Sequence, residues 1–443
     1  MGFSVFVILF NCEMGVNTTS RSALFVAYHY PPIRSAGVIR SVSFIRYLRE
    51  LGYSCQILTT SAYGGDDDVL RAWEPISFYR WLFNPKVRGG ILDSKNRTPP
   101  GIFSRILRKL LIPDVQVFWI PTAFFLGWYH IKNRQCDLIY SSFPPASGHL
   151  VAFFLHRYTG LPWVADFRDS WIFDPLDPEL RKSRWRLVLE RYLENKVISN
   201  ANIIVSATEE AAQALREAYP SYSKKFNVIY NGFDCRIAPD GIVKLENDVL
   251  FLIHTGSFSY SHAQRTPTQL FNALGLLLDE DPSWSKRIRV VLAGALSVEE
   301  KSAAAALIKV GIVRLEGVLD SEQVRNLQQM ANILLLVDHV RPWSSTNIPG
   351  KFFEYLAMRK PILSIGGNGA VQNLMGRLNA GWHVDGQDPE AILVALKELY
   401  FAGKSGTLVC QTDPMEIAQF HRRTETQQLA NCFDKAIESL CCQ

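Results

Sequence analysis

Apolar and polar residues alternate along this chain in two kinds of segment. Short apolar runs rich in β-branched residues, such as 23–27 (ALFVA) and 202–207 (NIIVSA), are separated by longer amphipathic stretches. In one such stretch, 37–51, apolar residues recur with the period of an α-helix, and Gly52 follows as a C-cap. This alternation predicts βαβ units built around buried parallel sheets.

Two series of these units follow each other. Strands are predicted in the first half at 23–27, 55–60, 137–142, 163–167, 202–207 and 227–231, and in the second at 250–256, 288–294, 313–317, 333–338, 361–366 and 381–385. Residues 235–248 lose both periodicities and contain Pro-Asp-Gly, which indicates a linker. We therefore expect two doubly wound α/β domains, 1–237 and 249–406, a linker at 238–248, and a helical C-terminal segment, 407–443, that packs back.

Composition and charge exclude several classes of protein. Apolar residues make up 48% and charged residues 20% of the 443 residues, so a disordered chain is excluded. The 47 basic and 42 acidic residues leave a net charge of +5, too small for a general nucleic-acid binder. The basic excess is local, because 80–135 holds ten Lys/Arg and two Asp/Glu.

The eight cysteines include no C-x-x-C pair, so neither a zinc cluster nor a disulfide framework is predicted. A reducing cytoplasmic location fits this pattern. The apolar run near the start of the chain is too short to span a bilayer and lacks a basic flank.

Ligands of open parallel sheets bind at the carboxyl ends of the strands, where helix N-termini meet. The first candidate is the loop 29–37 (HYPPIRSAG), which opens a helix at Gly37 and carries Arg34, with Arg40 following in the helix. It lacks G-x-G-x-x-G and the P-loop pattern, which argues against a dinucleotide dehydrogenase and a P-loop NTPase. The alternative is a purely structural turn.

The second candidate is the helix that begins near Gly350, after the strand 333–338 and a polar loop. Amides at its start are suited to bind a phosphate, and Lys351 adds a cation. Glu354 lies on the same face of the helix as Lys351 and is suited to accept hydrogen bonds from ribose hydroxyls. The alternative is that Lys351 and Glu354 form an ordinary surface pair.

These segments together resemble a GT-B glycosyltransferase of the family 4 type. The resemblance rests on YHYPPIRSAGVIR, LGYSCQILTT, DLIYSSFPP, GLPWVADFRDSW, VIYNGFD, HTGSFSYSHAQRTPTQLFNAL and IPGKFFEYLAMRKPIL, which span nearly the whole chain. It implies two facing Rossmann-like domains, a nucleotide sugar held mainly by the C-terminal domain, an acceptor held by the N-terminal domain, and a C-terminal helix that crosses back.

Carried over position by position, Glu354 matches the second glutamate of the E-x7-E motif of the family, at the donor ribose. The first glutamate is absent, and Thr346 stands in its place. After the first glycine of the C-terminal domain, Gly256, the family has an arginine where this chain has Ser257. The companion cation matches Arg265, which the resemblance implies is the diphosphate clamp, with Lys351 as the substitute for the missing arginine.

Arg168 matches the histidine that ends the corresponding N-terminal strand in many relatives, and Asp166 and Asp169 flank it. A carboxylate there is suited to orient or deprotonate an acceptor hydroxyl, and the guanidinium to hold an acceptor or a phosphate. The alternative is an internal Asp–Arg pair that holds the following loop. We therefore predict catalytic roles for Asp166, Arg168 and Asp169.

No metal or cofactor is predicted, because Arg265, Lys351 and helix amides suffice to neutralise a departing nucleotide diphosphate. The acidic triplet Asp66-Asp67-Asp68 resembles a metal-binding D-x-D element but has no apparent partner ligand, and we do not assign it a metal.

The basic region suggests a membrane contact. Arg105, Arg108 and Lys109 alternate with apolar residues, and the aromatic stretch 117–129 follows, a pattern that an anionic membrane interface attracts. The expectation is a cytoplasmic protein with a peripheral membrane contact and a glycan or lipid-linked acceptor. The alternative is that the aromatics form the core of the N-terminal domain and the arginines a solvated face.

The function predicted is metal-independent transfer of a sugar from a nucleotide diphosphate to a hydroxyl acceptor, with retention of configuration as the resemblance implies. Two alternatives stay open, a non-catalytic binding protein of GT-B shape and a sugar-nucleotide epimerase. The departures at Thr346, Ser257 and Arg168 favour the first of them.

Overall fold

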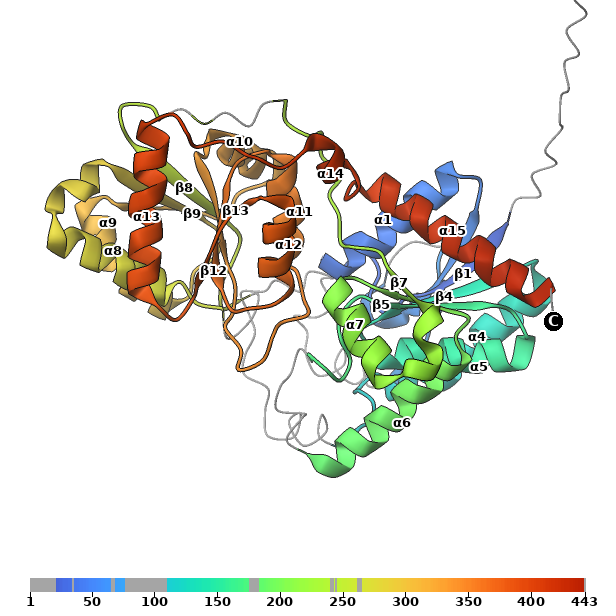
Figure 1. The fold of residues 1–443 in the computed structure, drawn as a ribbon. Coiled ribbons are helices and arrows are strands. Elements are labelled where there is room, and N and C mark those ends of the chain that lie inside the picture. The colour runs from blue at the N-terminus through green and yellow to red at the C-terminus, as the bar shows by residue number, and fades with distance from the viewer. Residues whose placement is uncertain are drawn as a thin grey trace, which may run out of the picture.

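The computed structural model of the chain describes residues 21–33, 36–64, 68–75, 110–174, 183–239, 243, 245–260 and 265–441. Within these residues the chain forms two α/β domains, each built on one parallel sheet (Figure 1). The predicted architecture of two parallel-sheet domains with a returning C-terminal helix is confirmed.

The N-terminal sheet has the strand order β3-β2-β1-β4-β5-β6-β7, and all its pairs are parallel. Its strands are β1 Ser22–Val26, β2 Ser54–Thr60, β3 Leu70–Ala72, β4 Leu138–Phe143, β5 Trp163–Phe167, β6 Ile203–Ser206 and β7 Phe226–Val228. The edge strand β3 was not predicted, because three residues are too few to show a period of two. The register places Phe143 beside Phe167, so β4 and β5 end at the same edge.

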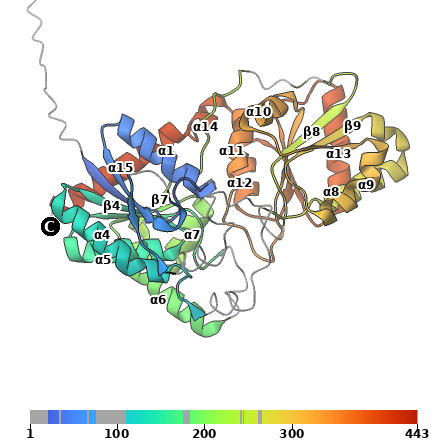
Figure 2. The same cartoon turned by 180° about the vertical axis from the view of Figure 1, so that it is seen from behind.

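Helices cover both faces of this sheet (Figure 2). They are α1 Ala36–Glu50, α4 Ile120–Asn133, α5 Ala146–Thr159, α6 Arg184–Asn200 and α7 Glu209–Ala218. Helix α1 shares its face with α15 (Arg422–Cys441), whose Leu429 and Phe433 are buried against Phe25 and Tyr140. Because apolar residues of α15 complete this core, the end of the chain belongs physically to the first domain.

The C-terminal sheet has the strand order β10-β9-β8-β11-β12-β13, again fully parallel. Its strands are β8 Leu250–Thr255, β9 Ile288–Ala293, β10 Val313–Gly317, β11 Ile333–Val337, β12 Ile362–Gly366 and β13 Gly381–Asp385. Its helices are α8 Thr268–Glu280, α9 Val298–Val310, α10 Ser321–Met330, α11 Gly350–Ala357, α12 Ala370–Leu378 and α13 Pro389–Lys404, and α14 Pro414–Ala418 leads to α15. The six predicted strands are all present.

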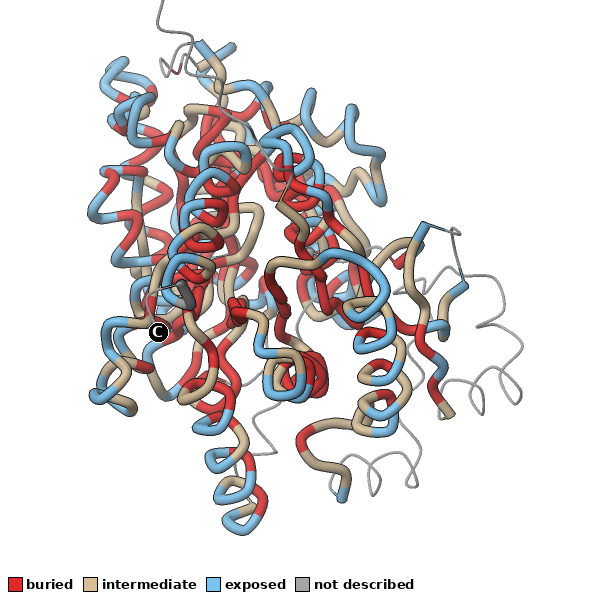
Figure 3. Tube along the Cα trace, turned by 90° about the vertical axis from the view of Figure 1, so that its right-hand side faces the viewer, coloured by how far each residue is buried: buried red, intermediate tan, exposed pale blue. Residues whose placement is uncertain are grey.

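Each sheet separates two apolar cores, one on either face, and buried positions follow the strands and the inward sides of the helices (Figure 3). None of the helices in the described ranges has the length and apolar character needed to cross a membrane.

A buried carboxylate joins the two domains. Asp174, which follows β5 and is fully buried, accepts hydrogen bonds from Trp343 Nε1 (3.1 Å) and Thr346 N (3.0 Å) and pairs with Arg341. These three partners lie in the loop after β11. Because a buried charge is stabilised only by such partners, Asp174 holds this loop against the N-terminal domain.

Candidate functional site

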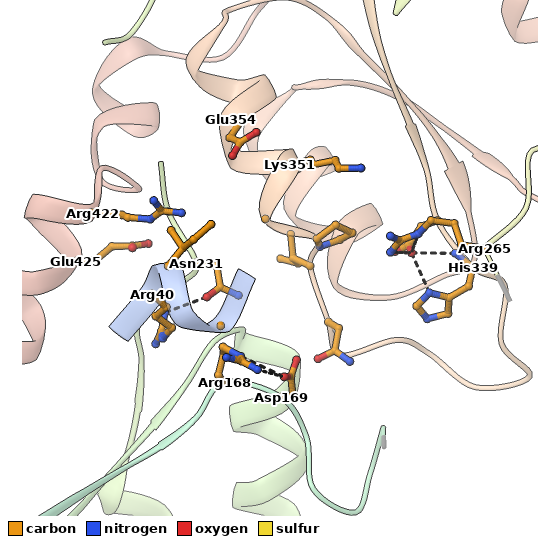
Figure 4. Close-up of a pocket in the computed structure, with 18 of the residues that line it drawn as sticks. Arg40, Arg168, Asp169, Asn231, Arg265, His339, Lys351, Glu354, Arg422 and Glu425 are labelled. Atoms are coloured by element: carbon orange, nitrogen blue, oxygen red, sulfur yellow. Dashed lines mark hydrogen bonds and ion pairs between the residues drawn. The ribbon is translucent and has the colours of Figure 1, made fainter. Parts of the chain in front are cut away.

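A cavity of about 400 Å³ lies between the domains, at the carboxyl ends of both sheets (Figure 4). Its walls come from the starts of α1, α11 and α15 and from the segments that follow β5 and β11. Six cations line it, namely Arg40, Arg168, Arg265, Arg341, Lys351 and Arg422. This surface is suited to bind an anion.

The start of α11 provides the first anion-binding element. Pro349 occupies its N-cap and offers no side-chain hydrogen bond, so the amides of Gly350 and Lys351 are left for a ligand, whereas that of Phe352 donates to the Pro349 carbonyl at 2.9 Å. Gly350, Lys351 and Glu354 all line the cavity, so the structure brings these predicted residues together.

Lys351 differs from the other five cavity cations. Each of those five pairs with a carboxylate, whereas Lys351 makes no hydrogen bond or ion pair with any residue in the described ranges. Burial and the nearby charge of Arg265 lower the pKa of Lys351 to about 8. It is therefore a largely desolvated cation without a direct ion pair among the described residues, although the charges of Glu354 and Asp338 oppose part of the fall in its pKa.

Gly256 makes room for this lysine. Its φ of 115° is a conformation that residues with side chains rarely adopt, and a Cβ there would overlap Lys351 Nζ. Neither Gly256 nor Ser257 is among the described residues that line the cavity. Gly256 therefore acts on the cavity through Lys351. Ser257 was predicted to bind the donor substrate, but it does not line the described part of the cavity.

Arg265 lines the same cavity and is oriented by Asp338, which follows β11. Its Nη2 donates to Asp338 Oδ1 at 2.8 Å, and His339 also lies beside this carboxylate. Burial alone would raise the pKa of Asp338, but hydrogen bonding from His339 and the charge of Arg265 hold it below its usual range. Asp338 therefore stays ionised and fixes the guanidinium at the cavity wall.

Glu354 lies one turn after Lys351 on the same helix, and burial raises its pKa. Arg422 and Lys351 are close enough to oppose this effect by their charge. A carboxyl group in this position is suited to accept hydrogen bonds from a pair of hydroxyls.

On the N-terminal side, Arg168 and Asp169 follow β5 and line the cavity as a pair, with Arg168 Nη2 donating to Asp169 Oδ2 at 3.0 Å. A Cβ at Gly37 would overlap the Arg168 guanidinium, so the glycine at the start of α1 allows this side chain to reach the cavity. Burial and the charge of Arg168 lower the pKa of His29 to about 4.

Asp166 does not occupy the place that the sequence suggested. Its side chain is fully buried and is absent from the described cavity lining. It accepts hydrogen bonds from Arg40 Nε (2.9 Å) and Nη2 (3.0 Å) and from Tyr140 Oη (2.5 Å). With both oxygens bound internally, Asp166 cannot act on an acceptor, and we assign it the positioning of Arg40.

Thr346, at the position of the missing glutamate, belongs to the contact between the domains. Its Oγ1 lies 2.8 Å from Ser170 Oγ, and its carbonyl accepts a hydrogen bond from Thr208 Oγ1 at 2.5 Å. It is not among the described residues of the cavity lining. Thr346 therefore does not line the cavity at the position where the resemblance places a glutamate in contact with the donor sugar.

Several residues beside the cavity were not predicted from the sequence. Asp338 ends a predicted strand, so the strand-end rule would have found it. Arg422 and Glu425 come from α15, and nothing in their local sequence indicates that this helix returns to the cavity. Burial raises the pKa of Glu425 well above its ordinary value.

No group of three or more potential metal ligands occurs in the part of the chain that the structure describes. Asp66 and Asp67 of the acidic triplet lie outside the described residues. The metal-free chemistry predicted from the sequence stays a prediction.

Comparisons with known proteins agree with this architecture. Residues 38–236 match the profile of a family described as Glycosyltransferase Family 4. No curated protein matches the chain.

Solved structures resemble the fold over nearly its whole length. A glycosyltransferase from Rickettsia africae ESF-5 is 15% identical with a TM-score of 0.57, covering 96% of this chain and 97% of its own. HepE from Anabaena, in complex with UDP and glucose, is 14% identical with a TM-score of 0.53, covering 94% and 99%. The lipopolysaccharide outer core galactosyltransferase WaaB is 13% identical with a TM-score of 0.58, covering 93% and 98%. The N-terminal domain therefore matches the family 4 glycosyltransferase profile, and the chain as a whole shares the two-domain fold of these glycosyltransferase structures.

Proposed function

We propose that this enzyme transfers a sugar from a nucleotide diphosphate sugar to a hydroxyl acceptor, with retention of configuration and without a divalent metal. The observation that carries the proposal is that Arg265, Lys351, Glu354 and the amides of α11 face one cavity between the domains. In that arrangement the cations that bind phosphate lie next to a carboxylate that accepts hydrogen bonds from ribose hydroxyls, as a nucleotide diphosphate requires.

The diphosphate binds, in this proposal, at the start of α11 between Lys351 and Arg265. When the bond between the anomeric carbon and the phosphate oxygen breaks, negative charge develops on that oxygen. Lys351 carries an unneutralised charge at this place, and Arg265 is already oriented by Asp338. Preorganised charge of this kind lowers the barrier without reorganisation during the reaction. Glu354 accepts hydrogen bonds from the ribose hydroxyls.

The acceptor approaches from the N-terminal side, where Arg168 and Asp169 line the opposite wall. Asp169 orients the acceptor hydroxyl and takes up its proton as the hydroxyl oxygen bonds to the anomeric carbon, and Arg168 holds a further polar group of the acceptor. We extend the proposal to a glycan acceptor linked to a lipid, met at the cytoplasmic face of a membrane by a peripheral contact.

The solved relatives support the nucleotide part of the proposal. Structures of HepE from Anabaena hold UDP, UDP with glucose, and UDP-glucose. A uridine diphosphate sugar is therefore the first donor to test.

The test combines binding and turnover. Thermal shifts with UDP-, GDP- and ADP-sugars identify the donor, because a ligand of the native state raises the apparent stability. The same donor is then used in hydrolysis and transfer assays of the wild type, Glu354→Gln and Arg265→Gln. We expect both variants to bind the donor more weakly and to turn it over more slowly than the wild type.

Lys309→Gln, an exposed change on α9, is the matched control and should behave as the wild type. A donor that binds but is neither hydrolysed nor transferred would contradict the transferase. A sugar nucleotide that is altered without any acceptor would indicate an epimerase instead.

A further inference from the structure

One side of the N-terminal domain exposes large aromatic residues. They are Phe125, Trp128 and Tyr129 of α4, Tyr158 of α5, and Trp185 and Tyr192 of α6, with exposed fractions between 38% and 68%. These three helices lie on the side of the sheet opposite α1 and α15 (Figures 1 and 2). Phe124 joins α4 to α5, because its ring centroid lies 5.4 Å from that of Tyr158.

Helix α6 has the reverse of the usual amphipathic pattern. Trp185, Val188, Leu189 and Tyr192 follow the spacing i, i+3, i+4, i+7, and this apolar stripe is exposed. In a helix of a soluble domain, such a stripe normally faces the core.

The charged residues of α6 that face inward have partners inside the protein. Arg186 is 1% exposed, pairs with Glu190 at 2.7 Å, and donates to the carbonyls of Leu111 (3.0 Å) and Pro113 (2.7 Å). Glu194 is fully buried and accepts a hydrogen bond from Tyr219 Oη at 2.7 Å. These bonds anchor α6 to the segment that precedes α4, so the outward apolar stripe is a built feature of the fold.

Exposed charge on these helices has one sign. Lys132, Arg157, Arg184, Arg191 and Lys196 are exposed, whereas the acidic residues within α4, α5 and α6 are Glu190 and Glu194, which are 7% and 0% exposed. Burial also raises the pKa of Glu194 to about 8, which lowers its negative charge at neutral pH. An exposed aromatic surface with only positive charges complements an anionic bilayer.

We propose that the outer face of α4, α5 and α6 docks on a bilayer surface that contains anionic lipids. The aromatic side chains enter the headgroup region, and the lysines and arginines bind lipid phosphates. This surface lies apart from the cavity between the domains, and the inference does not depend on the donor. The sequence prediction of a membrane contact rested on Arg105, Arg108 and Lys109, which lie outside the described residues.

Co-sedimentation of the full chain with vesicles tests the proposal. One set of vesicles contains phosphatidylcholine alone, and the other contains equal parts of phosphatidylcholine and phosphatidylglycerol. We expect binding to the second set, reduced by salt, because surface charges are screened. Arg184→Gln, Arg191→Gln and Lys196→Gln combined should weaken this binding by at least about tenfold. Trp128→Ser, Trp185→Ser and Tyr192→Ser combined should also weaken it and reduce the residual binding at high salt.

Matched controls come from the exposed surface of the C-terminal domain. Phe401→Ser with Val298→Ser removes exposed apolar groups, and Lys286→Gln, Lys301→Gln and Lys309→Gln remove exposed charges. Both controls should bind vesicles as the wild type does. Circular dichroism and donor binding of all variants check that the fold is kept.

The proposal fails if the wild type ignores anionic vesicles, or if the α6 variants bind them as well as the controls do. It also fails if analytical ultracentrifugation shows a dimer that the aromatic variant abolishes, since a second copy of the chain would then cover this face. Loss of transferase activity with vesicle binding intact would count against the proposed function alone.

Discussion

On each wall of the cavity a glycine makes room for a cationic side chain, but the two cations differ in whether a carboxylate pairs with them. On the N-terminal wall, Gly37 makes room for Arg168, and on the C-terminal wall Gly256 makes room for Lys351. Arg168 is paired with Asp169, whereas Lys351 has no carboxylate partner among the described residues. The number of cations on a wall therefore says little about its net charge. What distinguishes the walls is which cation remains unpaired.

This difference assigns the walls to different parts of a substrate. A half-buried cation without a direct carboxylate partner, beside a helix N-terminus, stabilises an anion strongly, which suits the diphosphate. A paired arginine beside a carboxylate offers donors and acceptors without much net charge, which suits a hydroxyl-bearing acceptor.

The largest expected effect concerns the buried support of the N-terminal wall. Asp166→Ala leaves Arg40 buried without its carboxylate, so the free energy of unfolding should fall by about 3–5 kcal/mol. Both side chains are at most 4% exposed. Chemical denaturation of the N-terminal domain, followed by tryptophan fluorescence, measures the loss.

Asp169→Ala is the matched control, because its pair with Arg168 is partly exposed and solvent screens it. It should change stability much less. Equal losses in the two variants would show that burial of the Arg40 pair is not what supports this wall.

The next largest effect concerns the unpaired cation. Lys351→Ala should lower kcat by about 10²–10³ fold, as removal of one preorganised group that stabilises developing charge does. Steady-state kinetics with the donor found by thermal shift give the value. Arg168→Ala should act mainly on the KM for the acceptor. If the two variants showed the opposite pattern, the assignment of the walls would be reversed.

The pKa of Lys351 gives a third test. Because burial and Arg265 lower this pKa to about 8, the ammonium is charged below that pH and neutral above it. Affinity for UDP should therefore be full below the pKa and decline by up to about tenfold per pH unit above it. Isothermal titration at several pH values measures the slope. Lys351→Met should abolish this slope, and a slope that persists in the variant would locate the titrating group elsewhere.

The smallest effect concerns the contact that joins the walls. Thr346→Val removes the hydroxyl that lies 2.8 Å from Ser170 Oγ and should lower the free energy of unfolding by about 1 kcal/mol. Thr268→Val, at an exposed position of α8, serves as the control and should leave stability nearly unchanged. Differential scanning calorimetry measures both variants. If they unfolded at the same temperature, the Thr346 hydroxyl would not stabilise the contact between the domains.

Much of the site could be predicted because strand ends can be recognised from sequence. Lys351, Glu354 and Arg168 each follow a predicted strand, and parallel strands bring their carboxyl ends to one edge. Asp166 could not be assigned in this way. It lies within β5, two residues before Arg168, and only the position of Arg40 on α1 decides that its carboxylate turns inward.

Local sequence determined the order of the elements, the two parallel sheets and the kinds of residue at their carboxyl ends, because the period of apolar positions and the strand-end rule act over short stretches of chain. Tertiary structure alone decided which cations are neutralised, that α15 delivers Arg422 and Glu425 to the cavity, and that α6 exposes its apolar stripe. These outcomes depend on contacts between residues far apart in the chain. No periodicity records such contacts, since partners such as Arg40 and Asp166 come from segments that meet only when the domain packs.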